Sequence, residues 1–468
     1  MDEPPASAPA PVATTPSTTT TTIPIPKPPP VTWVPCEDGL QCASVTVPVD
    51  YLDPGAGTLD LALVRRPASD PQRRIGTLLV DPGGPGASPV RRVRRGFRIS
   101  DEVAARFDIV GVDPRGVGGS TPITCGATVP ALRAVDLDPD DPREELALEE
   151  AARAVAEECA ATEGARLSHL GTREVVLDLE VVRRALGDGP VTFVGLSYGT
   201  LVGLLWADAF PTSVRAMVLD GVVDPLAAGD ALGLDQVDGV ERAFLAMDDA
   251  CAADPACPLT LRGTTLAQAY DQLAASIEAG AGQTAGVGPT QLVHAVFAAT
   301  YGAERWPGLW RAVADALDGR FAGLAEQARW YAGLVDYPPF ALVSCLDAEH
   351  PEGFDAWQRA ARLAADRSPR FGRTLANELL PCAFWPQATL GPVDVRAEGA
   401  GPILLVGTTG DVATPIGQMT RVASALEGDR RLTVEGHGHI AIGGSPCVDE
   451  AVTRFLVDPA GAPEEQRC

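Results

Sequence analysis

Lysine, histidine and long hydrophobic runs are scarce in this sequence of 468 residues. Lys27 is the only lysine, and we attribute the preference for arginine to genome composition, without reading it as a binding signal. Although 46% of the residues are hydrophobic, no uninterrupted apolar run approaches the roughly 20 residues of a membrane span. The formal net charge of −25 argues against nucleic acid as a partner. The chain is nevertheless long enough for a large core and more than one structural unit.

Metal-binding patterns are also missing. No two of the ten cysteines form a C-x-x-C pair, and the five histidines are too scattered for a zinc site. We therefore expect neither a metal nor another cofactor. An even number of cysteines, many beside loop residues, instead fits disulfides in an oxidising compartment, with buried free thiols as the alternative.

The first 31 residues are proline, threonine, alanine and serine with almost no large apolar side chains, which predicts a disordered tether. No hydrophobic signal core follows Met1, so either a signal peptide was removed or the protein is not exported. The cysteines favour export. We therefore expect a secreted or cell-envelope protein, and a monomer.

The stretch VTFVGLSYGTLVG, residues 191–203, places Ser197 between two glycines. Apolar and β-branched residues precede the serine, and a run with helical spacing follows it. A tight strand-to-helix turn needs Gly195 and Gly199, because a Cβ at either place would strike the neighbouring backbone. The pattern predicts a nucleophile elbow with Ser197 as the nucleophile. An ordinary glycine-rich turn is the alternative.

Short apolar strands alternate with helices on both sides of a helical region. This alternation indicates an α/β fold with a parallel sheet, in which active sites lie at the carboxyl ends of the strands. We expect a hairpin over residues 42–49 and 59–64, with its first strand at the sheet edge. Further strands are expected at residues 77–80, 107–112, 191–194, 214–219, 402–406 and 431–434, and a helix from residue 172 to 186.

Helical periodicity dominates the region between residues 226 and 385, and no clear strand appears there. We expect a mostly helical cap above the strand ends, with helices near residues 266–277, 292–299, 309–317 and 324–334. The expected division is a tether (1–31), the first part of an α/β core (32–225), the cap (226–385) and the second part of the core (386–468).

A serine hydroxyl is a weak nucleophile and needs a base, which is itself oriented by an acid. In folds with a nucleophile elbow the chain order is serine, acid, histidine. His169 precedes the serine, and His294 and His350 lie in the helical region, so we expect none of these three to be the base. His437 and His439, in a glycine-rich turn after the last expected core strand, remain as candidates.

The acid is expected at Asp411, which directly follows the strand at 402–406. Asp220, at the end of the preceding strand, is the rival. An oxyanion needs two backbone donors, one from the residue after the nucleophile and one from the loop after an early strand. Tyr198 supplies the first, and Gly84, in the loop DPGGPG, is expected to supply the second.

Several motifs together carry a resemblance to a known family: GGPG, FDIVGVDPRGVGGSTP, GLSYGT, VLDGVVDP, GTTGDVATP and GHGH. The chain from Trp33 to Cys468 resembles the secreted proline-iminopeptidase-like and tripeptidyl-aminopeptidase branch of the α/β-hydrolase superfamily. In that family the base is the histidine that ends G-x-G-H, which implies His439. The sequence differs from the family at Pro82, where a histidine is usual, and at Ile440, where a small residue or threonine is usual.

The resemblance implies an α/β-hydrolase fold, with a mostly parallel sheet flanked by helices and a large helical cap, that acts through an acyl-enzyme. In this interpretation Ser197 attacks, His439 carries the proton, Asp411 orients His439, and the amides of Gly84 and Tyr198 hold the oxyanion. The substrate implied is a peptide with a free N-terminus. An esterase or small-amide hydrolase is the alternative, because fold and triad do not fix the substrate. A catalytically inactive binding protein is a third hypothesis.

An aminopeptidase must hold the substrate ammonium near the scissile bond, and a partly desolvated carboxylate is its natural partner. Asp347 lies in a Cys-x-Asp element that resembles a recurrent element of the family, and we expect it to be the anchor. Glu349 and Asp224 are the reserve candidates. A helix-capping or solvated acid is an equally good interpretation of Asp347.

The spacing of the ten cysteines favours pairing between neighbours in the sequence. Cys36 and Cys42 flank one short loop, and Cys251 and Cys257 flank another. The five expected disulfides are Cys36–Cys42, Cys125–Cys159, Cys251–Cys257, Cys345–Cys382 and Cys447–Cys468.

Overall fold

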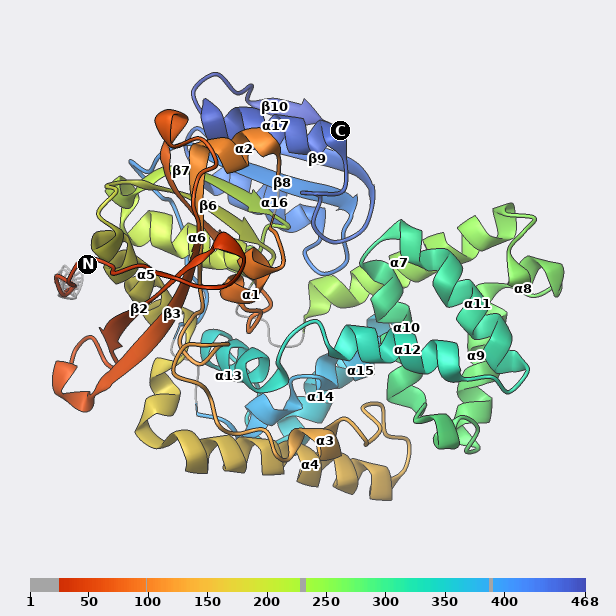
Figure 1. The fold of residues 1–468 in the computed structure, drawn as a ribbon. Helices are drawn as coiled ribbons and strands as arrows, with labels where there is room; N and C mark the ends of the chain where they lie inside the picture. The colour runs from red at the N-terminus through yellow and green to blue at the C-terminus, as the bar shows by residue number, and fades with distance from the viewer. Residues whose placement is uncertain (1–24, 98, 228–232, 387–389) are drawn as a thin grey trace, which may run out of the picture.

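The computed structural model describes residues 25–97, 99–227, 233–386 and 390–468 (Figure 1). Most of the tether expected at residues 1–31 lies outside these ranges. Its last residues contact helix α5 (Thr172–Leu186): the amide of Val31 donates to the carbonyl of Ala185 at 3.0 Å. Ile25 and Val31 also pack against the core. The end of the segment expected to be a tether thus contacts the core through Ile25 and Val31.

A single sheet of ten strands crosses the core in the order β1-β2-β3-β5-β4-β6-β7-β8-β9-β10. β2 and β3 form an antiparallel hairpin, and β3 is antiparallel to β5. The strands from β5 across to β10 are all parallel to their neighbours. The bounds are β1 Val34–Pro35, β2 Gln41–Pro48, β3 Thr58–Arg66, β4 Gly76–Asp81, β5 Phe107–Val112, β6 Val191–Leu196, β7 Val214–Asp220, β8 Ile403–Gly410, β9 Arg430–His437 and β10 Glu465–Arg467.

The α/β architecture and each of the core strands expected from the sequence are confirmed. One detail of the hairpin was wrong: β2 is not the edge strand, because β1 pairs outside it through Val34 and Cys42. A strand of two residues has no pattern that the sequence could reveal. β5 and β6 are buried at every residue, as continuous apolar strands covered on both faces should be.

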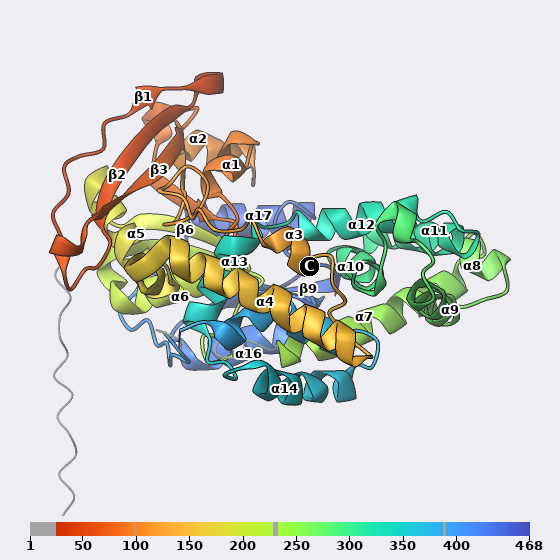
Figure 2. The same cartoon turned by 90° about the horizontal axis from the view of Figure 1, so that it is seen from below.

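Helices cover both faces of the sheet (Figures 1 and 2). Their apolar faces join two clusters of buried side chains, one on each side of the strands. On one face lie α5, α6 (Tyr198–Ala209) and α16 (Ile416–Ala425). On the other face lie α1 (Pro89–Arg94), α2 (Asp101–Arg106) and α17 (Pro446–Val457).

Between β7 and β8 the described residues contain helices and no strand, as the sequence predicts. Figure 1 shows α7 to α12 extending to one side of the sheet, with α13 to α15 beneath it. The bounds are α7 Leu234–Ala253, α8 Pro258–Leu261, α9 Leu266–Glu278, α10 Pro289–Thr300, α11 Trp306–Leu317, α12 Ala322–Ala332, α13 Tyr337–Asp347, α14 Phe354–Arg367 and α15 Gly372–Asn377.

The helical layer also includes a segment that precedes the elbow. Helices α3 (Val129–Leu132) and α4 (Pro142–Glu163) share one apolar cluster with α13, α14 and α15. The expected division counts this segment with the core at 32–225. Its packing instead associates it with the helices of the cap, and Figure 2 shows α4 beside α13 and α14.

The structure contains five disulfides, and their pairing is the one expected from the spacing of the cysteines. One of them, Cys345–Cys382, joins α13 to the turn after α15. Another, Cys447–Cys468, holds the last residue against the start of α17. In the described parts of the chain, no helix combines the length and the apolar character that crossing a bilayer requires.

Candidate active site

Ser197 lies at a sharp turn between β6 and α6, with the positive φ of 54° that is rare outside glycine. A Cβ on Gly195 would come within 2.4 Å of the carbonyl oxygen of Gly199. A Cβ on Gly199 would come within 2.7 Å of the carbonyl oxygen of Asp81. The turn therefore requires glycine at both positions, as the sequence predicts. It holds Ser197, with its strained backbone, at the carboxyl end of the central strands.

The glycine loop after β4 packs directly against this turn. A Cβ on Gly83 would lie 2.3 Å from the carbonyl oxygen of Leu196, so only glycine fits there. The amide of Gly83 donates to Asp81 Oδ1 at 2.8 Å, and burial raises the pKa of Asp81 to about 6. The next residue, Gly84, instead lines the cavity together with Tyr198. The loop therefore brings Gly84 to the cavity, beside the elbow.

His439 is paired with Asp411. The imidazole Nδ1 lies 2.9 Å from Asp411 Oδ2, and both side chains are almost completely buried. The amide and the hydroxyl of Thr414 also donate to the carboxylate, at 3.0 and 2.9 Å. Burial lowers the pKa of His439, but the charge of Asp411 and its hydrogen bond outweigh burial and raise the pKa above its usual value.

Asp220, the rival acid, has a different set of partners. Its Oδ2 accepts hydrogen bonds from the amides of Ala441 and Ile442, both at 2.8 Å. Its backbone carbonyl accepts the amide of Ser197 at 2.8 Å. Burial raises the pKa of Asp220 to about 6, although the two amides oppose that shift. Asp220 thus connects the elbow to the loop that carries His439, and it does not contact the imidazole as a hydrogen-bond partner.

The cap reaches the histidine loop. The amide of His439 donates to the carbonyl of Tyr301 at 3.2 Å, and Gly302 forms a β-bridge with Gly438. The ring of Tyr301 also stands edge-on to the imidazole, with centroids 5.6 Å apart. This contact joins the end of α10 to the loop after β9, so the position of His439 depends on the cap as well as on the core.

The remaining histidines lie elsewhere. His437 is exposed and packs beside the ring of Trp306, with centroids 5.0 Å apart. His169 lies 3.9 Å from Asp50, on the core side. His350 is buried in the helical layer. His294 lines the cavity, where its Nε2 lies 2.9 Å from Glu378.

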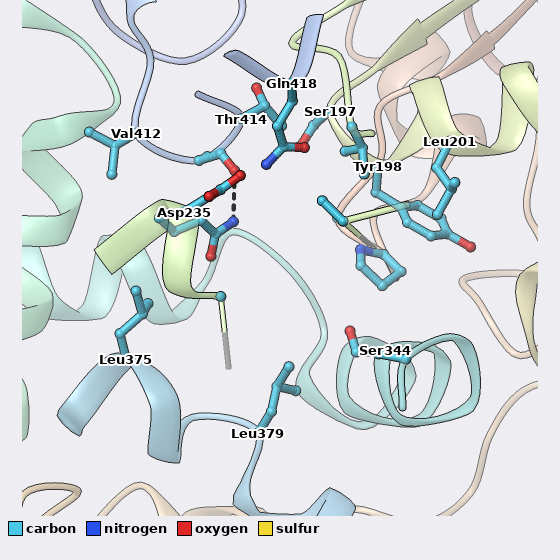
Figure 3. A pocket seen from close by; sticks show the side chains of 18 of the residues that line it. Ser197, Tyr198, Leu201, Asp235, Ser344, Leu375, Leu379, Val412, Thr414 and Gln418 are labelled. Carbon is cyan, nitrogen blue, oxygen red and sulfur yellow. Dashed lines mark hydrogen bonds between the residues drawn. The ribbon is translucent and has the colours of Figure 1, made fainter. Parts of the chain in front are cut away.

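A cavity opens above Ser197 and extends in two directions. One part, here the Asp347 lobe, has a volume of about 620 Å³ and reaches Asp347, Asp224 and Asp235. The other, the His439 lobe, has a volume of about 650 Å³ and reaches His439 and α1. Figure 3 shows the Asp347 lobe, with Leu375, Leu379 and Ser344 of the cap facing Ser197 and Thr414 of the core. Residues common to both lobes are Gly84, Ser197, Tyr301, Tyr331, Phe340 and Glu378.

Two of the three expected amine anchors line the Asp347 lobe. Asp347 accepts hydrogen bonds from the amide of Thr172, at 3.0 Å, and from its hydroxyl, and burial raises the pKa of Asp347 to about 7. Asp224 is bound at 2.6 Å by Arg421. Glu349 is exposed and is not among the residues that line either lobe, because it lies beyond the end of α13.

Sequence reasoning missed Glu378, which lies where the two lobes meet. Its carboxylate accepts a hydrogen bond from the hydroxyl of Tyr331 at 3.1 Å, and His294 Nε2 lies 2.9 Å from its other oxygen. Glu378 comes 181 residues after Ser197 and in no recognisable motif, so no signal in the sequence points to it.

The chain is similar to known proteins over most of its length. Residues 368–468 match the family model described as TAP-like protein. The chain is 32% identical to serine protease Hip1 of Mycobacterium tuberculosis, over 94% of this chain and 91% of that protein. It is 34% identical to carboxylesterase B of the same species, over 92% and 86%. It is 32% identical to tripeptidyl aminopeptidase of Streptomyces lividans, over 89% and 81%.

Proposed function

This chain belongs to the α/β-hydrolase family that contains tripeptidyl aminopeptidase and serine protease Hip1, and from that premise we propose Ser197, His439 and Asp411 as its catalytic triad. The chain is a serine hydrolase of the peptidase class. The observation that carries the triad is the pairing of buried His439 with buried Asp411 in a cavity that Ser197 also lines.

In the proposed mechanism Ser197 Oγ attacks the substrate carbonyl carbon while His439 Nε2 accepts the hydroxyl proton. Asp411 supports this because it engages Nδ1, which fixes the tautomer and leaves Nε2 for the serine. The amides of Gly84 and Tyr198 hold the oxyanion. His439 then gives its proton to the leaving group, which departs and leaves the acyl-enzyme. In the second half of the reaction His439 accepts a proton from a water molecule that attacks the acyl carbon, and it returns this proton to Ser197 Oγ.

The pH dependence of this mechanism follows from His439. A base must be neutral to accept a proton, so kcat/KM should fall as the pH drops through the pKa of His439, which lies above its usual 6.5. In Asp411→Asn the charge that raises this pKa is gone. We expect its acid limb to move to lower pH and its kcat to fall by about 10⁴-fold, as loss of the orienting acid does elsewhere. A pH–rate profile of both proteins on one chromogenic amide is the measurement. An acid limb that does not move would contradict the assignment of Asp411.

The proposed substrate is a peptide with a free N-terminus, bound with its amine in the Asp347 lobe. Asp224 and Asp235 in this lobe are both paired with Arg421, at 2.6 and 2.9 Å. Within the described residues the carboxylate of Asp347 has no such cation, and its hydrogen bonds come from the amide and the hydroxyl of Thr172. A buried carboxylate without a countercharge beside the nucleophile favours an ammonium as its partner.

A panel of chromogenic substrates tests this proposal. It should contain aminoacyl, dipeptidyl and tripeptidyl amides with free amines, the same compounds with acetylated amines, and short-chain esters. We expect turnover of the free-amine amides and little turnover of their acetylated twins. Preference for esters, irrespective of the amine, would favour the esterase alternative, which the similarity to carboxylesterase B keeps in view. No turnover and no labelling by a fluorophosphonate would favour an inactive scaffold.

Asp347→Asn should raise KM for free-amine amides by about tenfold and change KM for esters little, because only an ammonium requires the charge. In the wild type, protonation of Asp347 should also raise KM for these amides as the pH falls below about 7. Steady-state kinetics on both substrate classes are the measurement, with exposed Glu349→Gln as the control. An equal loss on amides and esters would remove the anchor role from Asp347.

We also propose that the protein acts outside the cytoplasm, since five disulfides persist best in an oxidising compartment. The domain division is likewise a proposal: a core over residues 32–225 and 386–468, with a cap over 226–385. The packing of α3 and α4 with α13 to α15 supports adding these two helices to the cap.

A further inference from the structure

Only one of the two lobes of the cavity is lined by the proposed catalytic base, and this difference determines the direction in which a substrate binds. His439 lines the His439 lobe and is not among the residues of the Asp347 lobe. In acyl transfer the base returns its proton to the leaving group. The leaving group must therefore lie in the His439 lobe, and the acyl part of the substrate in the Asp347 lobe. This orientation rests on the proposed function.

The His439 lobe is lined by arginines. Arg91, Arg92 and Arg95 come from α1 and the residue that ends it, directly after the glycine loop. Arg91 and Arg95 are four residues apart and therefore lie on the same face of the helix. Arg133 lines the lobe as well, but it donates to the carbonyl of Ala332 at 3.0 Å.

The arginines in and directly after α1 differ in their ion pairs. Within the parts of the chain that the structure describes, Arg91, Arg92 and Arg95 form no ion pair with a carboxylate, whereas Arg94 on the same helix pairs with Glu37 at 3.4 Å. The carboxylates that do line this lobe are Asp336, at the start of α13, and Glu378, at the junction with the Asp347 lobe.

Of the three side chains, that of Arg92 is the least free to bind a ligand. Its guanidinium lies over the ring of Phe97, 5.4 Å from the centroid, and burial lowers its pKa. Arg91 and Arg95 are exposed at the lobe and carry no such contact among the described residues. They are therefore the two groups best placed to meet a negative charge on a leaving group.

We propose that the His439 lobe selects leaving groups that carry a carboxylate, through Arg91 and Arg95. The preferred substrates are then short peptides in which the C-terminal carboxylate, or an acidic side chain, lies within a few residues of the scissile bond. Together with the amine site, this places the carboxylate of Asp347 and the two guanidinium groups in different lobes of the cavity that Ser197 lines. A guanidinium binds a carboxylate through charge-assisted hydrogen bonds, and the gain is modest at an exposed site.

The test compares peptides that differ only in the charge of the leaving group. One tetrapeptide is offered as the free acid and as the C-terminal amide, and a third version is an amide with aspartate as its last residue. A tripeptidyl p-nitroanilide with a neutral leaving group reports on the proposed function itself. Product release is followed by liquid chromatography and mass spectrometry at low and high salt.

We expect kcat/KM for the free acid to exceed that for the amide by about three- to tenfold at low salt, and the ratio to shrink at high salt. Arg91→Gln with Arg95→Gln should bring the ratio close to one. Arg94→Gln, on the same helix but paired with Glu37, should leave the ratio as in the wild type. The aspartate amide shows whether a side-chain carboxylate serves as well as the C-terminal one.

Equal rates on the free acid and the amide, with the p-nitroanilide cleaved normally, would overturn this inference and leave the proposed function intact. So would a ratio that the double substitution does not change. Failure of the folded wild type to cleave the p-nitroanilide and every free-amine amide of the substrate panel would overturn the proposed function, and this inference with it.

Discussion

Ser197→Ala should lower kcat by about 10⁵- to 10⁶-fold and leave the fold unchanged. The substitution removes only the attacking oxygen, and the loss of a triad nucleophile in other serine hydrolases has an effect of this order. Alanine at this position also keeps the small volume that the turn between β6 and α6 requires. The measurement is kcat on the best amide of the substrate panel, together with the circular dichroism spectrum and Tm.

Ser344→Ala is the matched control. Ser344 lines the same cavity from α13 but faces the serine from the cap (Figure 3). It should retain kcat within a few-fold of the wild type. Residual turnover by a carefully purified Ser197→Ala protein at more than a few per cent of wild type would exclude Ser197 as the nucleophile.

His439→Ala should be nearly as damaging as loss of the serine, because the members of a triad act as a unit. His437→Ala should change kcat by no more than a few-fold. The two histidines stand in the same GHGH motif, but His439 is buried against Asp411, whereas His437 is exposed beside Trp306. Steady-state kinetics of the two single variants under identical conditions give the comparison.

The assignment of the base would be wrong if the two variants exchanged these phenotypes. A further check comes from the cap, because the amide of His439 is bound by the carbonyl of Tyr301. Both variants keep this backbone contact, so a difference between them reports on the imidazole and not on the position of the loop.

Much of the core and of the proposed triad could be predicted because each feature is local in the sequence. The elbow is specified by two glycines within five residues, and their clashes with the carbonyls of Gly199 and Asp81 show why. The strands around it are continuous apolar runs. Helix α5 ends where the sequence predicts, because the residue after it, Gly187, has a left-handed conformation. The disulfides were predictable for the same reason, because each cysteine pairs with the next or the previous cysteine along the chain.

Features that depend on contacts between distant segments could not be predicted. Asp220 ends one core strand and Asp411 directly follows another. Only the fold shows that amides of the histidine loop bind Asp220 and that His439 binds Asp411. Glu378 reaches the cavity from the cap, and nothing near it in the sequence marks a site. In the sequence the arginines of α1 look like those of any solvent-exposed charged helix. Only the structure shows that they line the cavity.

The helical layer shows a further limit. Helical periodicity identified the helices of residues 266 to 334, but it could not tell that α4, which precedes the elbow, packs with them. Periodicity reports which face of a helix is apolar and not what covers that face. The expected division placed α4 in the first part of the core, because α4 precedes β6 in the chain.

The proposed role of Ser197 is that of a nucleophile that acts on peptides with a free amine. Its most direct test is the rate at which a fluorophosphonate labels the protein in the presence of a tripeptide or of its N-acetylated twin, with peptide mapping of the label. We predict labelling of Ser197 alone, slowed by the free-amine tripeptide and little affected by the acetylated one. A folded protein that is not labelled, a label on another residue, or equal protection by both tripeptides would contradict the account.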